Sequence, residues 1–244
     1  MRKSKFFTFS KKYPFLKKIY YFYNVYIRNR KFMKNGSQFG EDVFLFSLFD
    51  KNYKGIYLDV GCYHPTKHNN TLIFFKNGWH GINIDLNPLT IELFNFMRPN
   101  DINLNIGVSS EELEKNLYFI DETNTQNTLS ENQLIFLKKH HNLKASEITQ
   151  KKIQTKKLDK ILEDHKLKKI DFMNIDIEGH ELDVIQTLNF EKVKIRYICI
   201  EMIEHNDFSK NNSDQIKSLL KENNFKLLKK FDFNYIYENT RFEN

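Results

Sequence analysis

The sequence predicts an α/β protein with a doubly wound, mostly parallel sheet. From Ser37 onward, strand-like apolar runs alternate with helix-like runs, and the chain then closes on two successive strand-like runs, FKLLKKF and NYIYE. Strands that alternate with helices form parallel sheets with helices on both faces, whereas consecutive strands pair antiparallel. The 244 residues are enough to bury an ordinary core without disulfides or a structural metal.

The expected elements follow one another from Ser37 to the end of the chain. Runs of apolar residues bounded by turn residues predict strands at 55–61, 81–85, 102–109, 170–178, 195–201, 225–231 and 234–238. Apolar residues at helical spacing predict helices at about 43–49, 71–78, 90–97, 158–165, 180–188 and 214–223. Residues 111–157 are the least regular part and read as an insertion, in which 117–122 could add a strand and Ser130 with Gln133 forms a capping box.

The first 36 residues differ in composition from the domain expected at 37–244. Residues 1–34 contain 11 Lys and Arg and no Asp or Glu, which leaves 27 basic and 31 acidic residues in the rest of a chain whose net charge is +7. A mildly acidic body is a poor surface for nucleic acid, because binding phosphates needs cations clustered over the docking face. We therefore expect no nucleic-acid partner.

The N-terminal segment has two interpretations. On a helix after Pro14, five apolar residues fall near one face, with Lys17 and Arg28 opposite: Phe15, Ile19, Phe22, Tyr23 and Tyr26. This pattern suits an interfacial helix on anionic lipid, and it equally suits a helix packed on the domain through its aromatic residues. The longest uncharged stretch, 19–27, is too short to span a bilayer, and no signal-cleavage site follows it.

The expected compartment is the cytoplasm, with residues 1–34 able to contact the inner face of the membrane. Cys62 and Cys199 lie far apart in apolar runs, which favours reduced thiols over a disulfide. The sequence gives no indication of the oligomeric state.

Carboxylates follow four of the expected strands, where an open α/β sheet binds its ligands. They are Asp59, Asp85, Asp176 with Glu178, and Glu201. A helix cap would explain any one of these acids, but it explains all of them together less well. Gly61 would let the backbone approach a ligand closely, and Asp85 ends the second strand, where an acid can accept both ribose hydroxyls of an adenosine.

Strand alternation places Asn174, Asp176 and Glu178 on one face of the fourth main strand. Burying them is costly unless they bind something, and three roles are open. They could grip the amino group of a cofactor, hold a divalent cation, or act as a base on a hydroxyl. His180 could be that base or could cap the next helix. The sequence has no GxSxG, HExxH, Walker or paired CxxC motif, which argues against several hydrolase, NTPase and zinc classes.

Taken together, these motifs resemble the FkbM-type family of S-adenosylmethionine-dependent methyltransferases. The resemblance covers about residues 37–205 and rests on SQFGED, YLDVGCYHP, Asn69-Asn70-Thr71, NGWHGINIDLNP, MRPND, QTKKLDKIL and FMNIDIEGHELDVI, in that order. It implies a Rossmann-like class I methyltransferase fold with a seven-stranded, mostly parallel sheet and an antiparallel closing strand. The cofactor would then lie across the first two strands.

The resemblance also implies roles for individual residues. The implied cofactor contacts are Asp59, Gly61, Tyr63, His64, Asn70, Thr71, Asp85 and Val108. The candidates for the catalytic base are Asp176, Glu178, His180 and Glu201. A cation such as Mg²⁺, held by Asp176 with Glu201, would instead lower the pKa of the acceptor hydroxyl.

We therefore expect an O-methyltransferase that acts on a sugar hydroxyl of a surface glycan or its lipid-linked precursor, with residues 111–157 setting the choice of acceptor. Two alternatives stay open. A metal-dependent glycosyltransferase would use Asp176-Ile177-Glu178 to hold a diphosphate through a metal and would bind nucleotide sugars with Mn²⁺. A non-catalytic, membrane-docked assembly module would bind lipid but not S-adenosylmethionine.

Overall fold

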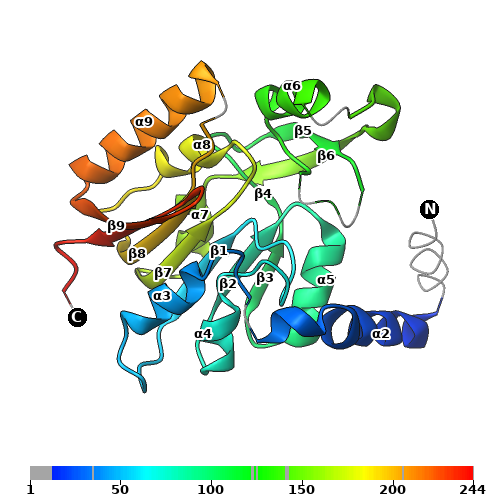
Figure 1. Cartoon of the computed structure of the whole chain (residues 1–244), viewed down its shortest axis with the longest axis horizontal. Coiled ribbons are helices and arrows are strands. Elements are labelled where there is room, and N and C mark those ends of the chain that lie inside the picture. Colours follow the sequence, from blue (N-terminus) through cyan, green and yellow to red (C-terminus); the bar gives the residue numbers. More distant parts are fainter. Residues whose placement is uncertain are drawn as a thin grey trace.

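The computed structural model describes residues 13–34, 36–121, 124, 126–140, 143–204 and 206–243 (Figure 1). Its centre is a seven-stranded sheet of order β3-β2-β1-β7-β8-β10-β9. The strands are β1 (Ile56–Val60), β2 (His80–Asp85), β3 (Ile102–Asn105), β7 (Lys169–Ile175), β8 (Lys194–Glu201), β9 (Phe225–Phe231) and β10 (Asn234–Asn239). β10 is antiparallel to both β8 and β9, while β3, β2, β1, β7 and β8 are parallel. The predicted sheet class is confirmed.

Helices cover both faces of this sheet because its central strands are apolar on both sides. On β1, Tyr57 packs toward α3 (Glu41–Ser47) and α4 (Leu72–Lys76), and α5 (Pro88–Met97) covers β2 and β3. Leu58, the next residue, packs into the opposite core, which contains α7 (Leu158–Asp164), α8 (Glu181–Ile185) and α9 (Asp207–Glu222). Alternate side chains of β1 thus pack into two different hydrophobic cores, one on each face of the sheet.

A small second sheet lies over the carboxyl end of the main sheet (Figure 1). The strand expected at 102–109 divides in two, because β4 (Gly107–Val108) leaves β3 and pairs with β6 (Thr149–Lys156). β5 (Glu114–Phe119) pairs antiparallel with β6, and α6 (Glu131–His140) packs nearby with the 3₁₀ turn η3 (Ala145–Glu147). The Gln133 N–H donates to the Ser130 Oγ at 3.2 Å, which is one half of the predicted capping box.

Three predicted boundaries differ from the structure. β7 ends at Ile175, so Asp176 and Glu178 belong to the following loop. α8 is a short helix that ends at Ile185. α9 begins earlier than expected, at Asp207, because the Asn206 side chain accepts a hydrogen bond from the Ser209 N–H at 2.9 Å and caps it.

The N-terminal helix packs across α5 (Figure 1). α2 (Pro14–Phe22) continues into the π-helix η1 (Tyr23–Arg28) and the 3₁₀ turn η2 (Arg30–Met33). Tyr20, Tyr21 and Val25 are buried against Leu89 and Leu93 of α5. Packing on the domain through aromatic residues is thus confirmed, but the residues that pack most deeply are not the five predicted ones.

The division between 1–36 and 37–244 stays a prediction, and residues 1–12 and 35 of that segment lie outside the described residues. Within the part of the chain that the structure describes, no helix is both long and apolar enough to cross a bilayer.

Candidate functional site

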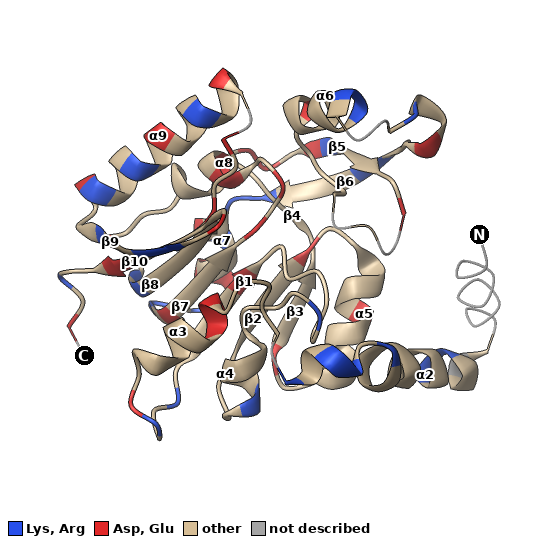
Figure 2. Ribbon diagram, in the orientation of Figure 1, with Lys and Arg blue, Asp and Glu red and all other residues tan. Residues whose placement is uncertain are grey.

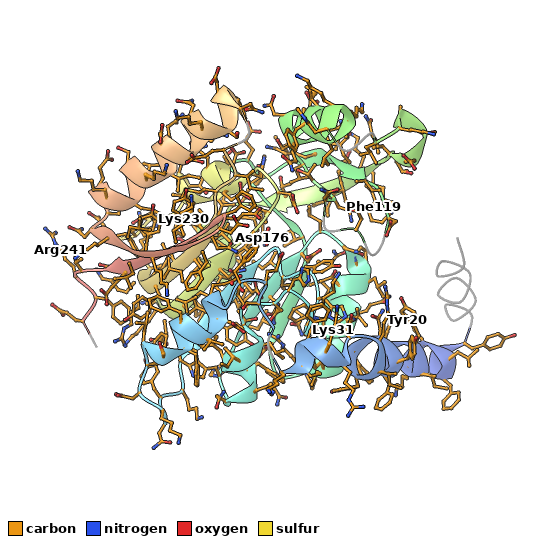
Figure 3. The ribbon with its side chains drawn as sticks, in the orientation of Figure 1. Tyr20, Lys31, Phe119, Asp176, Lys230 and Arg241 are labelled. Atoms are coloured by element: carbon orange, nitrogen blue, oxygen red, sulfur yellow. The ribbon has the colours of Figure 1, made fainter. Side chains whose placement is uncertain are left out.

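A pocket of about 320 Å³ opens at the carboxyl ends of β1, β2 and β7. Eight of the predicted site residues line it: Gly61, Tyr63, Asp85, Val108, Asp176, Glu178, His180 and Glu201. Asp176 lies near the middle of the molecule (Figure 3). A pocket of this size suits a small molecule or a cofactor.

The turn after β1 forms one wall of the pocket. Gly61 has φ +83°, and a Cβ added there would collide with the carbonyl oxygen of Asp176. Tyr63 is also left-handed, with φ 50°, which is strained for an aromatic residue. Its N–H donates to the Asp85 carboxylate at 2.8 Å. The turn is therefore held tightly against the end of β2.

Asp85 ends β2 and faces the pocket. Its carboxylate accepts hydrogen bonds from the N–H groups of Tyr63, at 2.8 Å, and Asn87, at 2.7 Å. Burial raises the pKa of Asp85 to about 6, although these two hydrogen bonds act in the opposite direction. A carboxylate has about four acceptor positions, so Asp85 keeps capacity for ligand hydroxyls.

Acidic residues occupy the other end of the pocket. The side chain of Asp176 is hydrogen-bonded to that of Glu201 at the end of β8. Burial, and then the charges of Glu181 and Asp59, raise the pKa of Asp176 to about 7. Burial also raises the pKa of Glu201 well above its usual value, and the nearby Asp176 charge adds to this effect. The pocket therefore holds carboxyl groups that exchange protons near neutral pH.

Two sets of hydrogen bonds hold the loop after β7, one from the insertion and one from Glu181 at the start of α8. Glu178 is left-handed, with φ 55°, and its carboxylate accepts from the Gln133 Nε2 at 3.3 Å. The Glu178 carbonyl accepts from the Thr128 Oγ1 at 3.0 Å. The Glu181 carboxylate accepts from the N–H groups of Ile177 and Gly179, both at 3.1 Å. The insertion thus fixes Glu178 beside Asp176.

His180 stands at the N-cap position of α8, but its side chain makes no capping hydrogen bond. Its Nε2 instead lies 2.9 Å from Asp183 Oδ2 and 3.3 Å from Ser109 Oγ. His180 thus occupies the predicted cap position, but its side chain pairs with Asp183 and does not cap the helix backbone. Its ring belongs to the pocket wall.

Four predicted cofactor residues do not line the pocket. Asp59, Asn70 and Thr71 are buried behind β1, where the Asp59 carboxylate accepts from Thr71 Oγ1 at 2.8 Å and from Asn174 Nδ2 at 3.0 Å. The fourth, His64, is buried beside Asn29, and burial with nearby cations lowers its pKa to about 3. These four residues lie outside the lining of the pocket, although His64 lines an adjoining hollow that shares Tyr63 and Lys67 with it.

The same interior cluster corrects the predicted face of β7. Asn174 points into it, donating to Asp59 and accepting from Asn70 Nδ2 at 2.9 Å. Asp176 and Glu178 lie beyond the end of the strand and line the pocket instead. Because strand alternation stops at Ile175, these three side chains do not share one strand face.

Several pocket residues were missed by sequence reasoning. Lys67 is the only Lys or Arg among the described residues that line the pocket, and its Nζ donates to the Tyr63 hydroxyl at 3.0 Å. Its position between the YHP and NNT motifs was a usable signal. Leu86, Ile106 and Leu129 add an apolar wall next to Val108. Leu129 comes from the insertion, whose path had no readable pattern.

The predicted cation at Asp176 and Glu201 gains no support from the geometry. Across the described ranges, no three His, Cys, Asp or Glu side chains are grouped as metal ligands. The carboxyl groups of Asp176 and Glu201 are instead hydrogen-bonded to each other.

The fold is that of a Rossmann-like α/β protein, and its pocket lies where the strand order reverses, between β1 and β7. Residues 59–227 match the family model described as the methyltransferase FkbM domain. Because this match covers more than half of the chain, the chain belongs to the FkbM methyltransferase family, as its motifs predicted.

The other two comparisons concern curated proteins and solved structures. No curated protein matches the sequence significantly. Among solved structures, the methyltransferase FkbM from Methylobacillus flagellatus aligns with 91% of this chain at 11% sequence identity and a TM-score of 0.48. The alignment covers 54% of that protein, so the present chain spans about half of its length.

Proposed function

We propose that this chain transfers a methyl group from S-adenosylmethionine to a sugar hydroxyl, in a surface glycan or a lipid-linked precursor. The observation that carries the proposal is a pocket with two chemically different ends. Apolar residues and Asp85 lie at one end, and carboxyl groups of Asp176, Glu178 and Glu201 lie at the other. S-adenosylmethionine has the matching order, from an adenosine to a cationic sulfonium and ammonium.

The pocket residues fit this cofactor group by group. Leu86, Ile106 and Val108 offer an apolar surface to an adenine, and Asp85 offers acceptors to ribose hydroxyls. The acids near Asp176 favour positive charge, and Lys67 would hold the carboxylate of the methionine part. When bound, the cofactor supplies a methyl carbon on a sulfonium, which leaves as a neutral thioether.

The residues of the chain would orient the acceptor and take its proton. Holding reactants in line can supply roughly 7–11 kcal/mol of a barrier. The acceptor hydroxyl loses a proton as its oxygen bonds to carbon, and the ionised form of the Asp176–Glu201 pair is placed to receive it. A general base of this kind contributes typically 10²–10⁴-fold in rate.

A second hollow, of about 50 Å³, adjoins the pocket at Glu201; it is too small to enclose a sugar ring, but the polar side chains around it suit contacts with one. Amide and aromatic side chains from α6, from α9 and from the residue that caps α9 line it: Asn132, Gln133, Phe136, Asn206, Phe208 and Asn212. Amides both donate and accept hydrogen bonds, as sugar hydroxyls do. The ring of Phe208 is 49% exposed and offers an apolar face.

The cytoplasm remains the proposed compartment. Cys62 and Cys199 are both buried and unpaired, which suits reducing conditions.

A methyl-transfer assay tests the proposal. Purified protein is incubated with methyl-labelled S-adenosylmethionine and a panel of free and lipid-diphosphate-linked sugars, and methyl ethers are identified by mass spectrometry. Asn212→Ala should raise the KM for the sugar roughly fivefold, since a lost hydrogen bond costs about 1 kcal/mol. Asn211, its exposed neighbour on α9, lies outside the hollow, so Asn211→Ala is the matched control.

Two outcomes would overturn the proposal. Transfer to lipid or protein but to none of the sugars would contradict the acceptor class. Tight binding of nucleotide sugars with Mn²⁺, without any binding of S-adenosylmethionine, would favour the glycosyltransferase alternative.

A further inference from the structure

The N-terminal helix leaves an apolar stripe in solvent. Phe15 is 72% exposed, Ile19 43% and Phe22 52%, and these residues follow one another at helical spacing along α2. Tyr23 and Ile27 continue the stripe into η1, and both are exposed. A contiguous set of large exposed apolar side chains marks an interaction surface.

The orientation of this helix is fixed by the side that faces the domain. Lys17 forms an ion pair with Glu92 of α5 at 2.6 Å, and the Tyr21 hydroxyl donates to the same carboxylate. Tyr20 and Val25 are buried below them. Because these contacts hold the inner face, the stripe of Phe15, Ile19, Phe22, Tyr23 and Ile27 faces outward.

Basic side chains flank the stripe, and the segment that carries it has no acidic residue. Lys18, Arg28, Arg30 and Lys31 are exposed, and residues 1–34 contain no Asp or Glu. Figure 2 shows blue but no red segments along α2. Two copies of this face would bring like charges together, which opposes self-association. A partner must therefore be apolar at its centre and negatively charged around it.

We propose that this stripe docks onto the surface of an anionic lipid membrane. The aromatic and aliphatic side chains enter the interface between headgroups and acyl chains, and the flanking cations attract anionic headgroups. The helix would lie in the plane of the surface, because its exposed apolar residues run along its length. This proposal is independent of methyl transfer, because it rests only on residues 13–31.

Docking would also orient the pocket. α2 lies on α5, and α5 begins at Pro88, directly after the pocket residues Asp85, Leu86 and Asn87. η2 follows Asn29, whose Nδ2 lies 3.1 Å from His64 Nε2 in the loop after β1. The membrane-facing segment is thus rigidly joined to two walls of the pocket.

Vesicle sedimentation of the full chain tests the proposal, using phosphatidylcholine vesicles with and without phosphatidylglycerol. We expect binding only when phosphatidylglycerol is present, and weaker binding at high salt because salt screens exposed charges. The triple variant Phe15→Ser, Ile19→Ser, Phe22→Ser should weaken binding roughly tenfold or more, since it removes the apolar contacts. The control variant Val43→Ser, Ile135→Ser, Leu227→Ser changes three other exposed apolar residues and should bind normally.

Circular dichroism should show that both triple variants keep the native unfolding temperature, because the changed side chains are exposed. Absence of binding to phosphatidylglycerol vesicles would overturn the proposal, as would equal binding by the two triple variants. A concentration-dependent dimer that the α2 variant abolishes, without lipid binding, would show instead that a second copy covers the stripe.

Discussion

Asp176 and Glu201, at the ends of the neighbouring parallel strands β7 and β8, are joined by a hydrogen bond between their side chains. Two carboxyl groups can share such a bond only when one of them carries a proton. The bond therefore places a proton at the acidic end of the pocket, next to the proposed position of the sugar hydroxyl. Because the pKa of Asp176 is about 7, the pair loses or regains this proton near neutral pH. Stability, cofactor binding and catalysis would then all depend on the pH in the same range.

Stability of the ligand-free protein should depend on the protonation of Asp176. Its pKa in the folded state, about 7, lies above the usual 3.8, so its contribution is fully present below about pH 4 and is lost as the pH rises through about 7. We expect the unfolding temperature to fall between about pH 5 and pH 7 through this group and to level off above about pH 8, and Asp176→Asn to flatten that fall.

Asp164→Asn is the control for this measurement. Asp164 is an exposed partner of Lys156 and Lys160, and these partners lower its pKa to about 2, so it stays ionised over the same range. Wild-type, Asp176→Asn and Asp164→Asn proteins with parallel curves would contradict the assignment.

Gly61 should not tolerate a side chain. Gly61→Ala is expected to destabilise the protein by more than about 1 kcal/mol, since it adds a collision with the Asp176 backbone to an unfavourable positive φ. Gly40 has a similar φ of +88° but no atom within 4 Å of an added Cβ, so Gly40→Ala isolates the conformational effect. Denaturant unfolding should show a clearly larger loss for Gly61→Ala, and equal losses would refute the close approach.

Arg98 should be the strongest stabilising residue behind the pocket. It is fully buried, and its guanidinium donates to the Pro65 carbonyl at 2.7 Å and to Thr71 Oγ1 and Asn69 Oδ1, both at 2.8 Å. Arg98→Met should cost about 3–5 kcal/mol, because it removes the donors to these three buried acceptors together with the cation that lowers the pKa of the buried Asp59.

The more exposed Arg196 serves as the control for Arg98. Urea unfolding should show a much smaller loss for Arg196→Met. Similar losses for the two variants would mean that the buried cluster does not depend on the Arg98 charge.

The affinity for S-adenosylmethionine should rise with pH, because acidic residues of the pocket become negatively charged and the cofactor carries a positive charge. Raising the pH from about 6 to about 8 ionises Asp85 and Asp176, whose pKa values are about 6 and about 7. S-adenosylmethionine carries a sulfonium charge that S-adenosylhomocysteine lacks, so its affinity should increase more over this range. Calorimetric titrations of both ligands at the two pH values check this, and identical increases would count against an acidic sulfonium site.

The class of the sheet and the acidic edge were predictable because both follow from short-range patterns. Alternating strands and helices define the doubly wound sheet, and Asp85 and Glu201 lie at the ends of clear apolar runs. The prediction that Asn174, Asp176 and Glu178 share one strand face was wrong, because the sequence alone does not show that β7 ends at Ile175. One residue past a strand end, alternation no longer determines where a side chain points.

Long-range contacts explain the remaining misses. Asp59 and Thr71 matched the expected cofactor motif, yet both are enclosed by Arg98, which is brought to them by α5. A single Arg after a helix gives no sign of complete burial. The contacts of the insertion with Glu178 likewise depend on how β4 and β6 pair across distant parts of the chain.

The most direct test of the proposed cofactor site is calorimetric titration of S-adenosylmethionine into wild-type protein, Asp85→Asn and the surface control Asp164→Asn. We predict one site per chain in the wild type, unchanged affinity in Asp164→Asn, and affinity weaker by roughly tenfold or more in Asp85→Asn, because a hydrogen bond to a charged group contributes about 1.5–3 kcal/mol. Circular dichroism should show that Asp85→Asn is folded. Absence of binding to the folded wild type, or equal affinity in Asp85→Asn, would contradict the assignment of this pocket to S-adenosylmethionine.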